Sequence, residues 1–113
     1  MIQILHNPRC KKSREGLQFL EDNNVDFEII KYLDNKLSES ELDVIITKLK
    51  IAPIALVRKN EAIWKSDYKG KELSNSEIIK AMIAHPKLIE RPIIINKNKA
   101  VVGRPTETIK TIL

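Results

Sequence analysis

A short apolar run that passes directly into an amphipathic segment constrains the fold of this chain more than any other feature. Residues 2–5 are apolar except for one glutamine, and two of them are β-branched isoleucines, which favours a strand. Residues 11–23 place Leu17 and Leu20 on one face, which favours a helix. Cys10 is therefore predicted to lie at the start of a helix, just after the loop that follows a strand.

This predicted position favours an anion at the sulfur of Cys10. The free N–H groups of a first helical turn carry partial positive charge. Arg9, Lys11, Lys12 and Arg14 are expected to act in the same direction. Such surroundings lower a cysteine pKa to roughly 3.5–7.5. A lone cysteine can also be an inert buried residue, but the helix start and the flanking cations favour a reactive thiolate.

Composition limits the class of protein. A chain of 113 residues is expected to form one domain with a core of its own. One cysteine excludes an internal disulfide, and its spacing from His6 and His85 does not fit a metal site. Neither a signal peptide nor an apolar run of about 18 residues is present, which predicts a cytoplasmic protein that does not enter a membrane.

The charge of the chain favours a small anionic partner over nucleic acid. The net charge is +5, from 20 basic and 15 acidic residues. Only five residues are aromatic, and they do not alternate with the basic residues as a nucleic-acid surface would require. A positive field that attracts a small anion is the simpler interpretation.

The middle of the chain continues with a strand and a long helix. Residues 25–33 are rich in strand formers and complete a β-α-β unit. Ser38 and Glu41 form a capping-box motif. The apolar residues after it have helical spacing: Leu42, Ile45, Ile46 and Leu49. This apolar stripe could dock a partner, but packing into the core is the simpler interpretation.

Shorter elements are expected after this helix. Pro53 suits the first turn of a short helix, whereas residues 59–71 show no regular pattern. A second capping box at 74–77 opens a helix that is expected to end before Pro86.

The last part of the chain predicts a hairpin and a helix. Residues 93–95 and 100–102 read as two strands joined by a polar four-residue turn, 96–99. Pro105 is suited to the first position of a final helix. The residues expected to pack inward from that helix are Ile109, Ile112 and Leu113.

This order of elements resembles the thioredoxin fold, an α/β fold. The resemblance implies a small mixed sheet, made of the βαβ unit and the C-terminal β-hairpin, with a helical insertion between the halves. In that fold a proline that leads into the hairpin is usually cis and lies beside the cysteine. We therefore expect a cis bond between Arg91 and Pro92.

Four motifs narrow the resemblance to the glutaredoxin-linked arsenate reductase (ArsC) family. The first is His6-x-x-x-Cys10-x-x-x-Arg14. The others surround three arginines: Arg58 in Leu-Val-Arg-Lys-Asn, Arg91 in Glu-Arg-Pro-Ile and Arg104 in Gly-Arg-Pro-Thr-Glu. The resemblance covers nearly the whole chain and implies a single ArsC-type domain over residues 1–113.

The resemblance also implies roles for these residues. Cys10 would be the nucleophile that attacks arsenic, and Pro92 the structural cis-proline. Guanidinium groups hold oxyanions through paired hydrogen bonds, and the arginines with this role would be Arg58, Arg91 and Arg104. The residues that support the thiolate and its loop would be His6, Ser13 and Arg14.

A second thiol must come from outside the chain. Positions 10–13 read Cys-x-x-Ser, so no internal cysteine can resolve a bond formed at Cys10. The resemblance implies glutathione as co-substrate, glutaredoxin as protein partner, no bound cofactor and a monomer.

Two other functions remain open from the sequence. The first is a glutathione-dependent thiol–disulfide reductase, acting on a glutathione mixed disulfide without arsenic activity. The second is an Spx-like regulator that binds RNA polymerase, although many such regulators have a second cysteine where this chain has Ser13. In well-established reductases of the family the cysteine is followed by Gly-Thr-Ser-Arg, whereas Lys11 and Lys12 stand in this chain.

Overall fold

The computed structural model describes residues 1–113. The chain divides into two compact units, each formed largely by its own contacts. The first unit combines residues 1–35 with residues 91–113, and the second unit is the intervening segment 36–90. The helical insertion expected from the sequence is therefore a unit in its own right.

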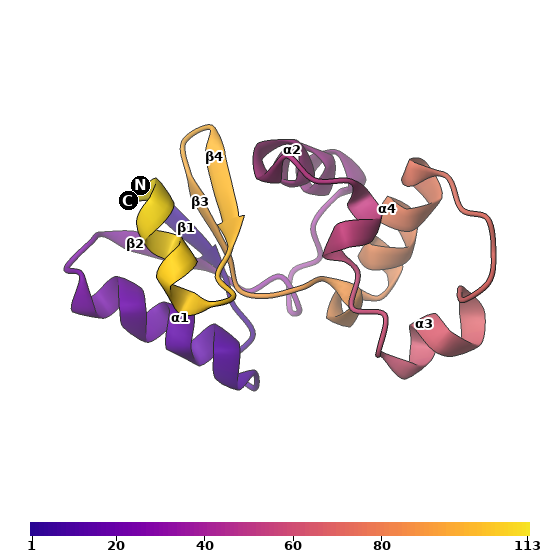
Figure 1. The fold of residues 1–113 in the computed structure, drawn as a ribbon, viewed down its shortest axis with the longest axis horizontal. Helices are drawn as coiled ribbons and strands as arrows, with labels where there is room; N and C mark the ends of the chain where they lie inside the picture. Colours follow the sequence, from indigo (N-terminus) through magenta and orange to yellow (C-terminus); the bar gives the residue numbers. More distant parts are fainter. The chain divides into compact units, whose positions relative to one another are not determined.

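A four-stranded mixed sheet forms the centre of the first unit (Figure 1). Its strands lie in the order β2-β1-β3-β4. Strands β1 and β2 are parallel, whereas β3 is antiparallel to both β1 and β4. The strands are β1 (Ile2–Leu5), β2 (Phe27–Ile30), β3 (Ile93–Asn96) and β4 (Lys99–Val102). This is the mixed α/β arrangement that the sequence predicted.

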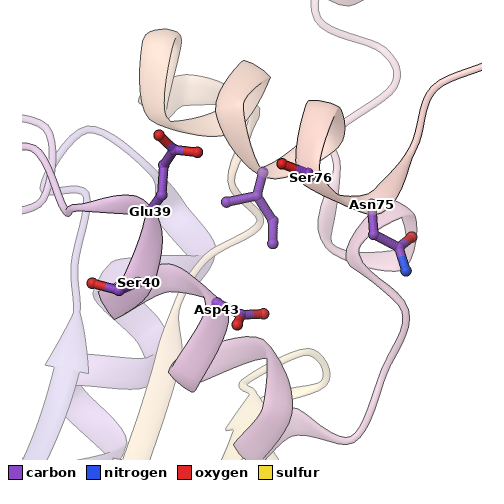
Figure 2. Close-up of a pocket in the computed structure, with 6 residues that line it drawn as sticks. Glu39, Ser40, Asp43, Asn75 and Ser76 are labelled. Atoms are coloured by element: carbon purple, nitrogen blue, oxygen red, sulfur yellow. The ribbon is translucent and has the colours of Figure 1, made fainter.

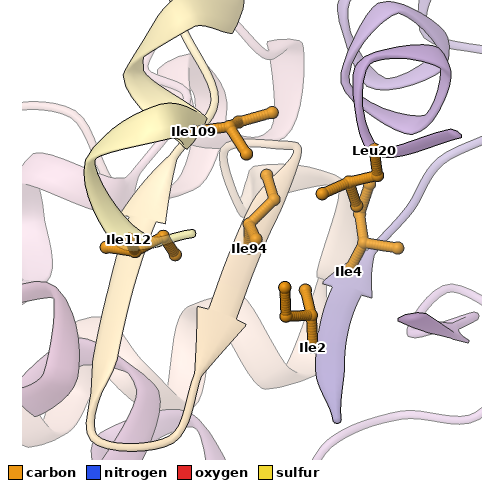
Figure 3. Packing of buried hydrophobic residues seen from close by; sticks show 6 residues of the cluster. All are labelled: Ile2, Ile4, Leu20, Ile94, Ile109 and Ile112. Atoms are coloured by element: carbon orange, nitrogen blue, oxygen red, sulfur yellow. The ribbon is translucent and has the colours of Figure 1, made fainter. Parts of the chain in front are cut away.

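Two helices cover one face of this sheet. They are α1 (Lys11–Asp22) and the C-terminal 3₁₀ helix η3 (Thr106–Ile112). Their apolar residues meet those of β1 and β3 in one cluster, which fixes both helices on the same side (Figure 3). The buried members are Ile2, Ile4, Leu20, Ile94, Ile109 and Ile112. Because α1 is held against β1 in this way, the loop between them has a defined position.

The second unit is helical. It contains α2 (Glu39–Leu49), η1 (Pro53–Leu56), α3 (Ala62–Asp67), α4 (Asn75–Ala84) and η2 (Pro86–Leu88). A short antiparallel bridge pairs Val57, which follows η1, with Ile89, which follows η2. Buried residues of α2 and α4 follow the helical spacing seen in the sequence.

Both capping boxes are present. The hydroxyl of Ser38 accepts the N–H of Glu41 at 3.1 Å, and the Glu41 carboxylate accepts the N–H of Ser38 at 2.9 Å. Ser74 and Glu77 repeat this exchange at the start of α4. The boundary of each helix was thus predictable from four consecutive residues.

Removing the first of these caps gives a stability test. We expect Ser38→Ala to lower the free energy of unfolding by about 1 kcal/mol, because one donor at the start of α2 loses its acceptor. Urea denaturation followed by the fluorescence of the single tryptophan measures this change. Ser76→Ala is the matched control, since Ser76 lies in the first turn of α4 outside the cap, and an equal loss there would contradict the capping explanation.

Three local predictions were wrong. Residues 62–67 form the helix α3, although no apolar pattern predicted a helix there. This helix is short, and its buried Trp64 stacks on Tyr68 with ring centroids 5.3 Å apart. Asn96 and Lys99 pair with each other, so the hairpin turn has two residues and not four. Leu113 is exposed, because the final helix is a 3₁₀ helix that ends at Ile112.

Candidate active site

The loop between β1 and α1 presents Cys10 at the start of the helix. Cys10 is the N-cap residue, with extended backbone angles, and its side chain is half-buried. Its N–H donates to the carbonyl of Asn7 at 3.0 Å, and its carbonyl accepts the N–H of Arg14 at 3.0 Å. These bonds fix the backbone on both sides of the sulfur, at the position that the sequence predicted.

The surroundings of Cys10 favour its thiolate. Burial raises the pKa of the Cys10 thiol, but the N–H groups of Ser13 and Lys12 and the guanidinium of Arg91 together lower that pKa below its ordinary value. Hydrogen bonds and the charge of Arg91 both contribute. The expected contribution of the N–H groups at the helix start is therefore present, whereas the side chain that lowers the pKa of Cys10 is that of Arg91, far away in sequence, and not one of the flanking cations.

Arg104 connects the sulfur to the segment that carries Arg91. Its Nη2 lies 3.5 Å from Cys10 Sγ, and its Nε donates to the carbonyl of Arg91 at 2.8 Å. Both arginines precede a cis peptide bond, at Pro92 as expected and also at Pro105, which was not expected. The two guanidinium groups therefore meet at the sulfur from the segments before β3 and after β4.

Pro92 is seated between two glycines. A Cβ atom at Gly16 of α1 would lie 2.7 Å from the Pro92 ring, and one at Gly103 would lie 3.0 Å from it. The N–H of Gly103 also donates to the carbonyl of Pro92 at 2.9 Å. Since Arg91 is bonded to Pro92, this close packing sets the distance between Arg91 and the helix that carries Cys10.

A buried polar network supports the loop from below. Ser13 is fully buried, and its Oγ accepts the N–H of Asn7 at 3.0 Å. The same Oγ lies 2.7 Å from His6 Nδ1, so the two side chains share a hydrogen bond. Burial lowers the pKa of His6, an interaction with Ser13 opposes this, and the charge of Arg14 lowers it further. The pKa of the His6 imidazole is therefore lower than that of an ordinary histidine, which favours its neutral form.

Arg14 and Asn7 complete the loop. Arg14 Nη1 donates to the carbonyl of Pro8 at 2.9 Å, and Asn7 Oδ1 accepts the N–H of Arg9 at 3.0 Å. Asn7 thus uses its N–H, carbonyl and side chain in the same loop, although the sequence reasoning did not select it. The Asn-Pro pair, which is typical of a turn, was the available signal.

Comparison with known proteins identifies this arrangement. The family model of the ArsC family matches residues 5–112. The chain belongs to the ArsC family. Over 114 residues this ArsC chain is 43% identical to an arsenate reductase of Haemophilus influenzae, covering 99% of this chain and 98% of that protein. It is 40% identical over 114 residues to an arsenate reductase of Neisseria meningitidis serogroup B, with coverage of 99% and 97%.

A solved structure shows the same fold. The structure described as an arsenate reductase from Vibrio cholerae superimposes with a TM-score of 0.95 and 39% sequence identity. The match covers 99% of this chain and 97% of that one. The thioredoxin-like fold predicted for this ArsC chain is therefore confirmed.

Arg58 belongs to the second unit of the ArsC chain. Its Nη2 lies 3.7 Å from a carboxylate oxygen of Glu61, and its Nε lies 3.9 Å from one of Glu90. Its Nη1 is buried without a hydrogen-bond partner in the protein. These distances describe ion pairs that are longer than hydrogen bonds, so the guanidinium keeps donors for a ligand.

Other features of this ArsC chain offer less chemistry. A groove of about 310 Å³ lies where α2 and α4 begin (Figure 2). The groove is lined by Glu39, Ser40, Asp43, Asn75, Ser76 and Ile79. Apart from Ile79 these residues are polar or acidic, and none of them is a predicted site residue. No group of three or more His, Cys, Asp or Glu side chains is placed to hold a metal ion. None of the helices has the length and apolar character needed to span a membrane.

The source of the thiolate's stability can be tested by alkylation. We expect iodoacetamide to react with Cys10 with a pH midpoint below the ordinary value of about 8.5, because the thiolate is favoured. Arg91→Ala should move this midpoint upward. Lys11→Gln also removes one positive charge, yet it should move the midpoint much less. Equal shifts of the midpoint in the two variants would show that general surface charge, and not Arg91 in particular, lowers the pKa of Cys10.

Proposed function

We propose that this ArsC-family chain reduces arsenate, with Cys10 as the nucleophile. The chain is similar over almost its full length to proteins named arsenate reductase, and an arsenate reductase-like oxidoreductase function follows from its family. The observation that carries the assignment of the nucleophile is the sulfur of Cys10, half-exposed at a helix start and flanked by Arg91 and Arg104.

Arsenate and a thiolate are both negative, so the site must offset their repulsion. Arg91 and Arg104 supply two guanidinium groups at the sulfur. We propose that these two groups bind the oxyanion in paired hydrogen bonds and stabilise the charge that develops as sulfur attacks arsenic. For Arg58, in the second unit, we propose oxyanion binding as a role of its own. The unpaired Nη1 of Arg58 supports this assignment, because a buried donor without an acceptor is costly.

The proposed reaction consumes two further thiols. The Cys10 thiolate forms a bond to arsenic(V), and an arsenate oxygen leaves as water. A glutathione thiolate then attacks the Cys10 sulfur; a disulfide forms, and the electron pair of the sulfur–arsenic bond reduces arsenic to arsenite. Glutaredoxin would regenerate the Cys10 thiolate from the mixed disulfide, since the chain has no second cysteine.

The remaining predicted residues would act through the loop. His6 and Ser13 hold its buried side, and Arg14 holds the carbonyl of Pro8. We propose that all three position Cys10 and do not touch the substrate. Pro92 would likewise not touch the substrate; through its packing on α1 it would position Arg91. We further propose that residues 1–113 act as one ArsC-type domain and as a monomer.

A coupled assay tests the function. NADPH oxidation is followed in the presence of glutathione reductase, glutathione and glutaredoxin, with either arsenate or a glutathione mixed disulfide as substrate. We expect arsenate-dependent turnover in the native chain and none above background in Cys10→Ser. Turnover with the mixed disulfide alone would favour the thiol–disulfide reductase, and no turnover with either would reject the enzyme assignment.

A further inference from the structure

Three cations near Cys10 have no role in the site described above. Arg9, Lys11 and Lys12 are exposed, and their side chains are not the groups that lower the pKa of Cys10. Lys12 has an exposed ion pair with Glu15 at 3.5 Å. No carboxylate lies within ion-pair distance of Arg9 or Lys11. We call these three residues the cationic rim.

The cationic rim stands where positive charge disfavours the helix. The N-terminus of a helix is the positive end of its dipole, and a cation there costs about 0.3–1 kcal/mol. The first turns of α2 and α4 carry acidic residues, whereas the first turn of α1 has none. Local preferences that a sequence violates in one place often mark a functional surface. Helix stability therefore does not account for the rim.

The chemistry of Cys10 indicates what must approach this surface. If the proposed function holds, on which this inference rests, an external donor must bring a sulfur atom into contact with Cys10 Sγ, because the chain has one cysteine. A protein donor cannot do so without covering the exposed residues around that sulfur. The rim flanks Cys10 in sequence on both sides and is part of that area.

We propose that the cationic rim is the docking surface for a protein thiol donor that carries carboxylates around its reactive thiol. Charges at the edge of an interface mainly raise the association rate and make it sensitive to salt. A small thiol reaches the sulfur without such an interface, so the rim distinguishes protein donors from small ones. The donor thiolate attacks Cys10 Sγ, a disulfide between the two proteins forms, and the thiol previously attached to Cys10 leaves. A second external thiol, on the donor or from glutathione, then attacks the donor sulfur of that disulfide and releases the Cys10 thiolate.

The test isolates this step from arsenate. Cys10 is converted with 2,2′-dithiodipyridine to a neutral mixed disulfide, and the release of pyridine-2-thione is followed by absorbance. The two reductants are an acidic glutaredoxin and dithiothreitol, a small uncharged thiol. We expect the double variant Arg9→Glu/Lys11→Glu to react with glutaredoxin about tenfold more slowly than the native chain. Its reaction with dithiothreitol should be unchanged.

A matched control lies at the other end of the sheet. The strand register places the β3–β4 turn beside the beginning of β1, whereas Cys10 follows the end of β1. Lys97→Glu/Lys99→Glu therefore changes the net charge equally at a distant place, and its glutaredoxin rate should remain that of the native chain. Added salt should slow the native reaction with glutaredoxin and have little effect on the rim variant.

The outcomes separate this inference from the proposed function. Equal glutaredoxin rates for the native chain and the rim variant, or equal losses in the rim and control variants, would overturn the docking surface. Either result would leave arsenate turnover by Cys10 untouched. Conversely, selective loss in the rim variant would support the docking surface even if the coupled assay showed no activity with arsenate.

Discussion

Replacing Arg104 by alanine should reduce kcat/KM for arsenate by about 10²–10³, the usual effect of removing one donor that stabilises a developing oxyanion. Arg104→Lys should be almost as damaging, although it keeps the charge. One guanidinium reaches both Cys10 Sγ and the carbonyl of Arg91, 3.5 and 2.8 Å away. A single ammonium nitrogen lacks the two-sided geometry of that group. Steady-state kinetics of the coupled reaction measures both variants.

Protein stability provides the control for this prediction. Arg104 is exposed, so its removal should change the free energy of unfolding by about 1 kcal/mol or less. Lys110→Ala removes an exposed cation from η3 and should affect neither stability nor kinetics by much. If Arg104→Lys retained native kcat/KM, charge alone would be sufficient and the two-contact role of Arg104 would be wrong.

The substitution Gly16→Ala is expected to disturb both stability and the thiol. Alanine is favoured over glycine in a helix by about 1 kcal/mol, but the new Cβ would lie 2.7 Å from the Pro92 ring. Overpacking of this kind typically costs about 1–3 kcal/mol. The ring is rigid and buried, so we expect the cost to win and the free energy of unfolding to fall.

Movement of Pro92 also displaces Arg91, which lowers the pKa of the thiol. The alkylation midpoint of Gly16→Ala should therefore move upward, a result that a loss of stability alone would not produce. Gln18→Ala is the matched control, because this side chain is exposed on the same helix. A variant Gly16→Ala that is as stable as the native chain, with an unchanged midpoint, would show that the contact with Pro92 does not position Arg91.

Sequence reasoning succeeded where the signal was local. Ser38 and Glu41 predicted the start of a helix because both partners of the cap lie within four residues. The two hydrogen bonds expected between them are present. Cys10 could be placed at a helix start because the change from strand spacing to helix spacing occurs beside it. The arrangement of the sheet could not be predicted from such local signals and was inferred from the resemblance to a known fold.

The reasoning failed where distant segments decide. The short helix α3 packs through the buried Trp64, and no apolar spacing within residues 59–71 predicts a helix there. The identity of the cation that lowers the pKa of Cys10 depends on how the segment before β3 folds back onto α1. Charges adjacent to Cys10 in the sequence were the wrong guide, because the side chain that acts on the sulfur is that of Arg91.

The surroundings of the His6 imidazole have a consequence for proton transfer in the proposed reaction. Its Nδ1 lies 2.7 Å from the hydroxyl of Ser13, and burial lowers the pKa of the ring. Because this ring nitrogen is used inside the loop, we expect the oxygen that departs from arsenic to take its protons from the oxyanion itself or from bulk water. The rate of the first chemical step should then follow the ionisation of arsenate and of the thiol.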